Sequence, residues 1–173
     1  MRLICADKCD TKYLRLANLL YEKSFPIEER RDKFQQSIVE KHKDYRYDLV
    51  FLNGEFLGIA LYWETPTLIF LEHLAILPEK RNGGAGSKVL SLFKEMGKPI
   101  LLEIEPPKDS LTNRRLAFYE RNGFKLNPYF HLQAKLKKGD GDVELKVLTY
   151  PEIISEKDYL QFIDYMNKEI SAK

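Results

Sequence analysis

The residues best suited to chemistry lie in a glycine-rich turn, Arg81–Ser87, with the sequence RNGGAGS. The turn follows an apolar run, Leu68–Leu77, which is long enough for a central strand. After it, apolar side chains recur at helical spacing, which predicts a helix over Ala85–Met96. A turn between a strand and a helix N-terminus directs several backbone N–H groups to one point, at the positive end of the helix dipole. The segment therefore predicts a phosphate-binding site.

Two common phosphate-binding motifs do not fit this turn. A P-loop has the pattern GxxxxGK[ST], but neither Gly84 nor Gly86 is followed directly by Lys-Ser or Lys-Thr. A Rossmann turn has the pattern GxGxxG, and Val89 stands where its third glycine is required. The strands expected before the turn are also linked by hairpins rather than by helices. Both motifs are excluded by the residues present.

A carboxylate within the apolar run is a candidate for general-base chemistry. Glu72 interrupts the Leu68–Leu77 segment, where an ionised carboxylate is costly unless it is solvated or paired. Strand alternation predicts that Glu72 shares a face with Phe70 and Leu74, and that His73 points the other way. A structural ion pair is the alternative explanation for Glu72.

The remaining sequence supplies alternating strand and helix patterns that must position these groups. Asn53-Gly54 is a strong hairpin signal. Strands are expected at Arg2–Cys5, Tyr45–Leu52, Glu55–Glu64, Leu68–Leu77, Ile100–Glu105, Phe124–Leu126, Tyr129–Leu136 and Val143–Leu148. Helices are expected at Thr11–Ser24, Glu28–Lys41, Ala85–Met96 and Ser110–Arg121, and in a final segment after Pro151.

Two segments together resemble the signatures of one enzyme family. Arg81–Gly86 matches R/Q-x-x-G-x-G/A, and Asn113–Phe124, with the sequence NRRLAFYERNGF, is similar to a helix that ends at Gly-Phe. With both in the right order about 30 residues apart, the chain resembles the GNAT acetyltransferase superfamily from about Tyr13 to Leu148. The resemblance implies an α/β (α+β) fold. Its splayed, mostly antiparallel central sheet would have six to seven strands flanked by helices, with an additional C-terminal helix.

The resemblance also implies a binding site for acetyl-CoA as co-substrate. Its pyrophosphate would lie against the turn, at Arg81, Asn82, Gly83, Gly84, Ala85, Gly86 and Ser87. Its pantetheine arm would pair like an extra strand with the main chain of Leu74, Ala75 and Ile76, where the fourth strand splays from the fifth. Asn113 matches a family residue that contacts the pantetheine region, although a helix cap or a solvated polar residue is the alternative.

The same resemblance implies roles in proton transfer. Tyr119 matches the family tyrosine that serves as the acid for the leaving thiolate or contacts the thiol; a core aromatic is the alternative. The acceptor amine must be unprotonated to react. Glu72 is the first candidate for the base and Glu103, in the Ile100–Glu105 strand, the second, with His73 below Glu72. Water chains without a single base are also compatible with the pattern.

The expected function is therefore an N-acetyltransferase that moves an acetyl group from acetyl-CoA to a primary amine of a small molecule, peptide or protein. Direct transfer through a ternary complex is expected. The alternative is a non-catalytic acyl-CoA-binding or regulatory domain on the same fold. The acceptor pocket is expected from the first two helices and the closing hairpin.

Composition bounds the remaining expectations. The chain has 173 residues and a net charge of +2, which favours a single domain over 1–173 and disfavours nucleic-acid binding. A core of about residues 1–150 and a C-terminal helical extension over 151–173 are expected. No apolar stretch approaches the roughly 20 residues of a membrane span. Cys5 and Cys9 suggest free thiols in the cytoplasm, without a metal site. A monomer or a homodimer is expected.

Overall fold

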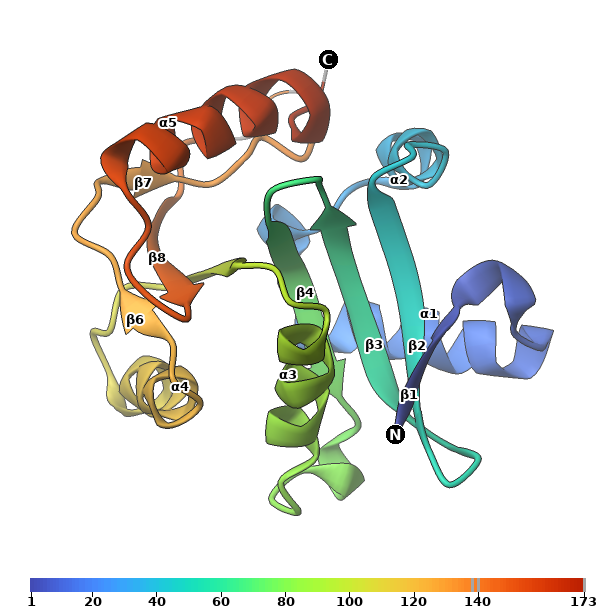
Figure 1. Cartoon of the computed structure of the whole chain (residues 1–173). Coiled ribbons are helices and arrows are strands. Elements are labelled where there is room, and N and C mark those ends of the chain that lie inside the picture. Colours follow the sequence, from blue (N-terminus) through green and yellow to red (C-terminus); the bar gives the residue numbers. More distant parts are fainter. Residues whose placement is uncertain (138, 140, 173) are drawn as a thin grey trace.

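An eight-stranded, mostly antiparallel sheet runs through the molecule, with helices on both faces (Figure 1). The structure is a computed structural model that describes residues 1–137, 139 and 141–172. The strands are β1 (Arg2–Cys5), β2 (Tyr45–Leu52), β3 (Glu55–Glu64), β4 (Ile69–Ile76), β5 (Ile100–Ile104), β6 (Lys125–Leu126), β7 (His131–Leu132) and β8 (Glu144–Tyr150). Their order is β1-β2-β3-β4-β5-β8-β6, and β7 pairs with β8. The predicted architecture is confirmed, with one strand more than the upper expectation.

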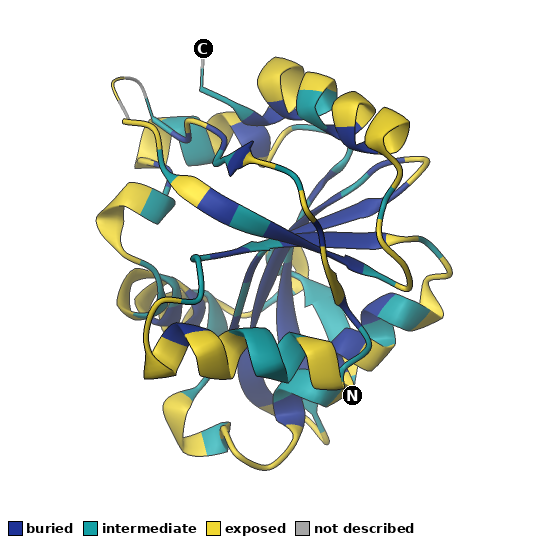
Figure 2. Ribbon diagram, turned by 90° about the vertical axis from the view of Figure 1, so that its left-hand side faces the viewer, coloured by how far each residue is buried: buried dark blue, intermediate teal, exposed yellow. Residues whose placement is uncertain are grey.

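The helices pack their apolar sides on the two faces of this sheet. They are α1 (Thr11–Ser24), α2 (Lys33–Val39), α3 (Ala85–Glu95), α4 (Ser110–Arg121) and α5 (Glu156–Tyr165), which continues as a π-helical turn, Met166–Ile170. α1, α2 and α5 cover one hydrophobic cluster, and α3 and α4 the other. The strands between them are mostly buried, whereas the helices expose their outer sides (Figure 2). No helix of the described residues is long and apolar enough to cross a membrane.

Local signals explain why several elements begin and end where predicted. Asn53 and Gly54 have φ values of 52° and 86°, as a two-residue hairpin between β2 and β3 requires. α4 begins at a capping box. The Asp109 carboxylate accepts from the Thr112 N–H, and the Thr112 hydroxyl oxygen accepts from the Asp109 N–H. α3 follows Gly84, which has a φ of 73°. Such a left-handed conformation favours glycine.

Two predicted elements differ by several residues from their bounds in the structure. The helix predicted over Glu28–Lys41 is wrong at its start, because Asp32 caps α2 by accepting from the Gln35 N–H at 2.8 Å. The residues before Asp32 form a 3-10 turn, Ile27–Glu29. The strand predicted over Tyr129–Leu136 shrinks to β7, and the chain leaves the ladder of β8 around Pro128, which has no N–H to donate.

The sheet opens between its fourth and fifth strands. β4 pairs in parallel with β5 only over Ile69–Leu71 and Ile100–Leu102. Beyond these residues β5 continues to pair with β8, and β4 continues to pair with β3. The second half of β4 therefore has one edge that no described strand covers.

The close packing of β3 against the second half of β4 leads to the first prediction. A Cβ added at Gly58 would overlap the carbonyl oxygen of Ala75 in the facing strand. Gly58→Ala should therefore push β4 away and lower the free energy of unfolding by about 1–3 kcal/mol. Urea unfolding measures this loss. Gly141→Ala is the control, because a Cβ there meets no atom within 4 Å, and equal stabilities of the two variants would contradict the packing.

Candidate active site

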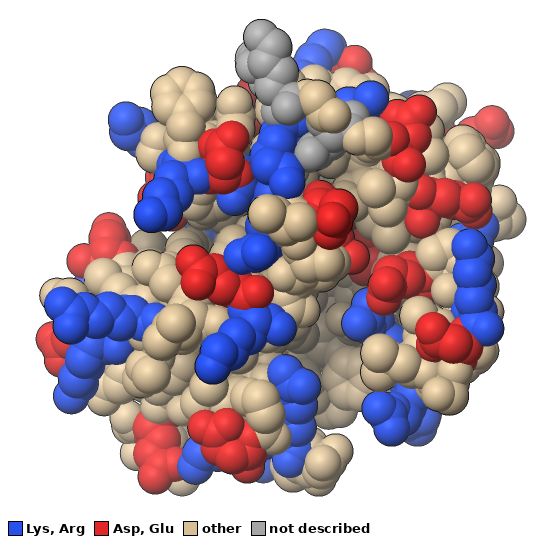
Figure 3. Space-filling model, turned by 180° about the vertical axis from the view of Figure 1, so that it is seen from behind, with Lys and Arg blue, Asp and Glu red and all other residues tan. Residues whose placement is uncertain are grey.

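A cavity of about 830 Å³ opens where β4 and β5 diverge. Its walls come from both strands, the start of α3, α4, the end of α1 and the 3-10 turn that follows α1. Seen from behind, the molecule is hollowed near its middle, and acidic and basic side chains are mixed over this face (Figure 3). One cleft thus gathers the glycine-rich turn and the two candidate carboxylates.

The uncovered edge of β4 presents main-chain polar groups to this cavity. Leu77 N–H donates to Leu57 O at 2.8 Å, towards β3. The Ala75 carbonyl also faces β3, where it lies against Gly58. Because backbone groups alternate between the edges of a strand, those of Leu74 and Ile76 point to the open side. Arg81 Nε confirms this direction, since it donates to the carbonyl oxygen of Ile76 at 2.9 Å. Of the three predicted main-chain contacts, Ala75 is thus already used by the sheet.

The glycine-rich turn lines part of the cavity. Its lining includes most of the predicted phosphate-binding residues: Arg81, Asn82, Gly84, Ala85, Gly86 and Ser87. Gly83 instead lines a neighbouring depression with Lys80 and Lys88. A Cβ at Gly86 would lie 3.1 Å from the ring of Phe118 on α4, so glycine allows α3 and α4 to approach. The first N–H groups of α3 have no partner within the helix and are available to an anion.

A β-bulge changes the direction of the residues in the middle of β4. Leu61 pairs with His73 and Tyr62 pairs with Leu71, so Glu72 is the extra residue. The His73 ring contacts Phe25 and Tyr21 of the α1 region, with ring centroids 4.4 and 5.2 Å apart. His73 therefore lies on the same face as Glu72, and the prediction of opposite faces is wrong.

Leu74 lies on the face of the sheet opposite to Glu72. Phe70 belongs to the cluster under α1 and α5, as predicted for the face of Glu72, whereas Leu74 packs with the cluster under α3 and α4. The shared face predicted for Glu72 and Leu74 is thus also wrong. Alternation holds on each side of the bulge and shifts by one residue across it.

Glu72 is held in a buried ion pair. Its two carboxylate oxygens accept from the two terminal nitrogens of Arg31 at 2.6 and 2.7 Å. The side chains are 1% exposed for Arg31 and 5% exposed for Glu72. Burial would raise the pKa of Glu72, but the charges of Arg31 and His73 and their hydrogen bonds together lower it to about 2. The carboxylate is thus a weak proton acceptor with both oxygens occupied.

Glu103 has a different environment at the end of β5. One oxygen, Oε1, bonds to Nε2 of His131, and the side chain is 11% exposed. The other oxygen makes no hydrogen bond to any described residue, and Glu103 lines the cavity. It is therefore a carboxylate with one oxygen fixed and one available.

Tyr119 faces the cavity from α4. Its half-buried ring packs against Phe118 and Phe124, with centroids 5.1 and 5.6 Å away. Its hydroxyl makes no hydrogen bond within the described part of the chain. Burial raises the pKa of Tyr119, although Arg115 partly opposes this effect. The phenol therefore keeps its proton at neutral pH and can donate it to a group in the cavity.

Asn113 lies apart from these groups. Its exposed side chain donates to the carbonyl oxygen of Asp109 at 2.7 Å, at the start of α4. Among the described residues, the lining of the cavity does not include it. The described residues also contain no group of three or more His, Cys, Asp or Glu side chains that could hold a metal ion.

Sequence reasoning missed two residues that contact the candidate carboxylates. A buried glutamate implies a buried cation, but the chain has 28 Lys and Arg residues, and nothing in the predicted helix Glu28–Lys41 marks Arg31 among them. His131 is one of three histidines, and no motif marks it. Only the folded arrangement brings them to Glu72 and Glu103.

The ion pair of Arg31 and Glu72 makes the second prediction. Glu72→Gln leaves a buried guanidinium without its charge partner and should lower the free energy of unfolding by about 3–5 kcal/mol. The pKa of Glu72 falls from an ordinary 4.5 to about 2 in the folded state. Its stabilisation is therefore complete above about pH 4.5 and is lost as the pH falls towards 2.

Chemical unfolding between pH 7 and pH 2 measures both effects. Glu105→Gln is the control, because it breaks a half-exposed pair with Arg115 and should cost less than about 1 kcal/mol. Similar losses for Glu72→Gln and Glu105→Gln, or an unchanged acid sensitivity in Glu72→Gln, would contradict a stabilising role for the buried pair.

Known proteins are similar to this chain in sequence and in fold. The model of the acetyltransferase (GNAT) family matches residues 11–124. The "Putative acetyltransferase YjbC" of Bacillus subtilis (strain 168) is 36% identical over 103 residues, or 58% of this chain. The match spans 52% of that protein, about half its length.

Solved structures agree with the family match. The "Putative acetyltransferase from GNAT family from Bacteroides thetaiotaomicron" has a TM-score of 0.90 and 27% identity, over 100% of both chains. The aminoglycoside 6'-N-acetyltransferase complexed with coenzyme A has a TM-score of 0.58 and 13% identity, over 86% of this chain and 96% of that one, and is similar in fold. From the matched residues and the shared fold, the chain belongs to the GNAT acetyltransferase family.

Proposed function

We propose that this chain is an N-acetyltransferase that transfers the acetyl group of acetyl-CoA directly to a primary amine bound in the same cavity. The observation that carries the proposal is the uncovered edge of β4 beside the glycine-rich start of α3. An extended ligand with amides and a pyrophosphate satisfies both features together. Coenzyme A has this composition, and one protein of the same fold was solved with it.

The edge of β4 and the glycine-rich turn bind different parts of the cofactor. The pantetheine amides pair with the main-chain groups of Leu74 and Ile76, as a peptide does when it adds a strand to a sheet. The pyrophosphate accepts hydrogen bonds from the N–H groups at Gly84–Ser87, at the positive end of the α3 dipole. The acetyl group then lies where β4 and β5 diverge.

Tyr119 is the proposed acid for the leaving thiolate. It lines the cavity, its hydroxyl has no hydrogen bond among the described residues, and its raised pKa keeps it protonated. A thiolate that leaves from the tetrahedral intermediate takes this proton and departs as a thiol.

Glu103 is the proposed base in preference to Glu72. The low pKa of Glu72 and its two bonds to Arg31 make it a poor proton acceptor, which favours a structural and electrostatic role. Glu103 has one oxygen available to the cavity. The acceptor amine approaches from the side of Phe25 and Glu29, which also line the cavity.

Thiol release from acetyl-CoA with a panel of amines tests the proposed function. Small diamines, amino sugars and short peptides serve as acceptors, and alcohols of the same size serve as matched controls. Acetylation of an amine, identified by mass spectrometry, is expected. Binding of acetyl-CoA without transfer to any acceptor would instead support a non-catalytic acyl-CoA-binding domain.

Gly84→Trp is expected to weaken the binding of acetyl-CoA by at least about tenfold, or about 1.4 kcal/mol. The indole blocks the N–H groups of the turn, and isothermal titration calorimetry measures the affinity. Gly97→Trp is the matched control, because Gly97 has a φ of 72°, close to the 73° of Gly84, and lies at the other end of α3. Equal affinities of the two variants for acetyl-CoA would contradict the binding of the pyrophosphate at this turn.

Tyr119→Phe should lower kcat by roughly 100-fold, because the thiolate then leaves without a proton. The affinity for acetyl-CoA should stay within about twofold of the wild type, since the ring and its packing remain. Phe118→Leu changes the neighbouring ring without removing a hydroxyl and controls for packing. A kcat of Tyr119→Phe equal to that of the wild type would limit Tyr119 to a packing role.

A further inference from the structure

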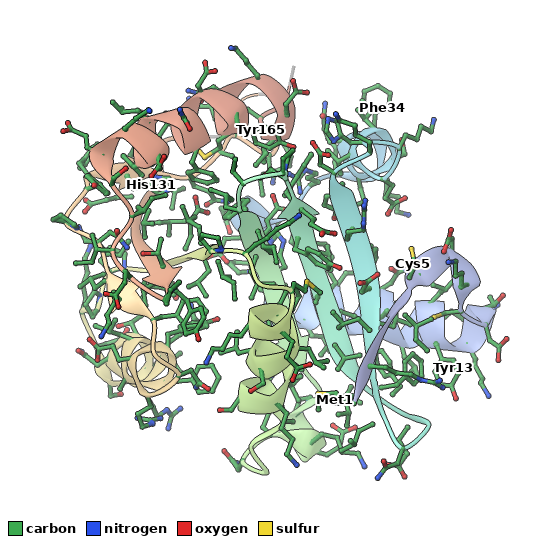
Figure 4. All side chains as sticks on the ribbon, viewed as in Figure 1. Met1, Cys5, Tyr13, Phe34, His131 and Tyr165 are labelled. Atoms are coloured by element: carbon green, nitrogen blue, oxygen red, sulfur yellow. The ribbon has the colours of Figure 1, made fainter. Side chains whose placement is uncertain are left out.

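A buried chain of hydrogen bonds joins Glu103 to the C-terminal helix. His131, fully buried with 1% of its surface exposed, bonds to Glu103 Oε1 through Nε2 and to the Tyr159 hydroxyl through Nδ1, at 3.0 Å. The Tyr159 hydroxyl bonds in turn to the carbonyl oxygen of Phe130 at 3.0 Å. His131 lies beneath α5, which supplies Tyr159 (Figure 4).

These contacts determine which ring nitrogen carries a proton. The Phe130 carbonyl can only accept, so the single hydroxyl proton of Tyr159 belongs to that bond. Nδ1 of His131 must then donate to the Tyr159 oxygen, and Nδ1 is protonated. Nε2 and a carboxylate oxygen are both acceptors unless a proton lies between them. Glu103 and His131 therefore share one proton in this structure.

We propose that His131 is a positioning residue for acetyl transfer, which holds Glu103 in place and shares the proton that Glu103 takes from the acceptor amine. The inference rests on the proposed function. Both His131 and Tyr159 lie C-terminal to the residues 11–124 that match the family model. Glu103 lies within the matched segment, so the arrangement joins a residue of the matched segment to two residues beyond it.

The protons balance over the reaction. The pair first loses its shared proton to solvent, and a bound ammonium, R–NH3+, then gives one proton to the oxygen of Glu103 that faces the cavity. A half-turn of the carboxyl group exchanges its two oxygens and places this proton against Nε2, which restores the shared proton. The nitrogen lone pair of R–NH2 forms the C–N bond, the C–S bond breaks, and the thiolate takes the proton of Tyr119. The nitrogen loses one further proton, which returns to Tyr119. One proton is released for each acetyl group transferred.

Other charged or titratable groups lie near Glu103 and act on the same pH profile. They come from several elements packed around Glu103: Glu29 of the 3-10 turn, Glu72 and His73 of β4, Glu105 after β5, Arg115 of α4 and Tyr159 of α5. Each of them remains in place in a variant of His131, so a change in the pH profile reports on the imidazole itself.

The pH profile of kcat at saturating acceptor tests the inference. His131→Gln keeps a polar side chain but cannot share a proton. We expect the rising limb to move to lower pH by at least about one unit, because a carboxyl group loses its proton more readily than an imidazolium does. We also expect kcat to fall by at least about tenfold, while the affinity for acetyl-CoA stays unchanged. Tyr159→Phe, which keeps its stacking on Tyr129, should shift the limb less and in the same direction.

His42→Gln is the control, because His42 is a partly exposed histidine outside the lining of the cavity among the described residues. A lower kcat with an unshifted limb in both His131→Gln and Tyr159→Phe would overturn the inference and leave the proposed function intact. If His131→Gln does not fold, two other measurements test the inference: the pH profile of Tyr159→Phe, and the 15N signals of the His131 ring in the wild-type protein as a function of pH. Ring signals that stay constant over the pH range in which activity rises would overturn it. Absence of amine acetylation by the wild type would overturn the proposed function, and this inference with it.

Discussion

After Leu71, β4 no longer pairs with β5, although it still pairs with β3. The main-chain polar groups on its β5 side still require hydrogen-bond partners. A strand edge inside a protein is costly when its N–H and C=O groups remain unpaired. Here the carbonyl oxygen of Ile76 already accepts a hydrogen bond from Arg81. Beside the other main-chain groups on this edge, the cavity leaves space for an extended ligand. The divergence of β4 from β5 thus creates both the cavity and the polar edge that we propose pairs with the cofactor.

The bulge at Glu72 lies where this divergence begins, and it couples the sheet to the rest of the fold. The extra residue directs Glu72 and His73 to one face, where Arg31 neutralises the carboxylate. Arg31 also donates to the carbonyl oxygen of Ile170 at 3.4 Å. The C-terminal segment therefore contacts the partners of both carboxylates, Arg31 through Ile170 and His131 through Tyr159. Burial of α5 against Phe70 secures this arrangement by aromatic packing.

Sequence predicted the features that depend on neighbouring residues. The hairpin at Asn53-Gly54, the glycine-rich turn and the bounds of α4 follow from turn and capping preferences, which act within a few residues. The family resemblance, carried by two local motifs, is confirmed by the matched family model. The roles of the individual site residues stay predictions.

Features that depend on distant contacts could not be predicted in this way. The bulge depends on the register between β3 and β4, and one extra residue reverses the face of His73. The inward direction of Arg31 depends on a carboxylate 41 positions away, and that of His131 on Glu103, 28 positions away. Neither partner leaves a periodic pattern in the sequence.

The most direct measurement is the exchange of individual backbone amides in β4, followed by NMR with and without acetyl-CoA. The uncovered edge should become hydrogen-bonded to the cofactor, so the Leu74 and Ile76 amides should exchange more slowly by at least about tenfold. The Leu77 amide, which already donates to Leu57 in β3, should change much less. Unchanged exchange at Leu74 and Ile76 in the presence of bound acetyl-CoA would contradict the claim that this edge of β4 binds the cofactor.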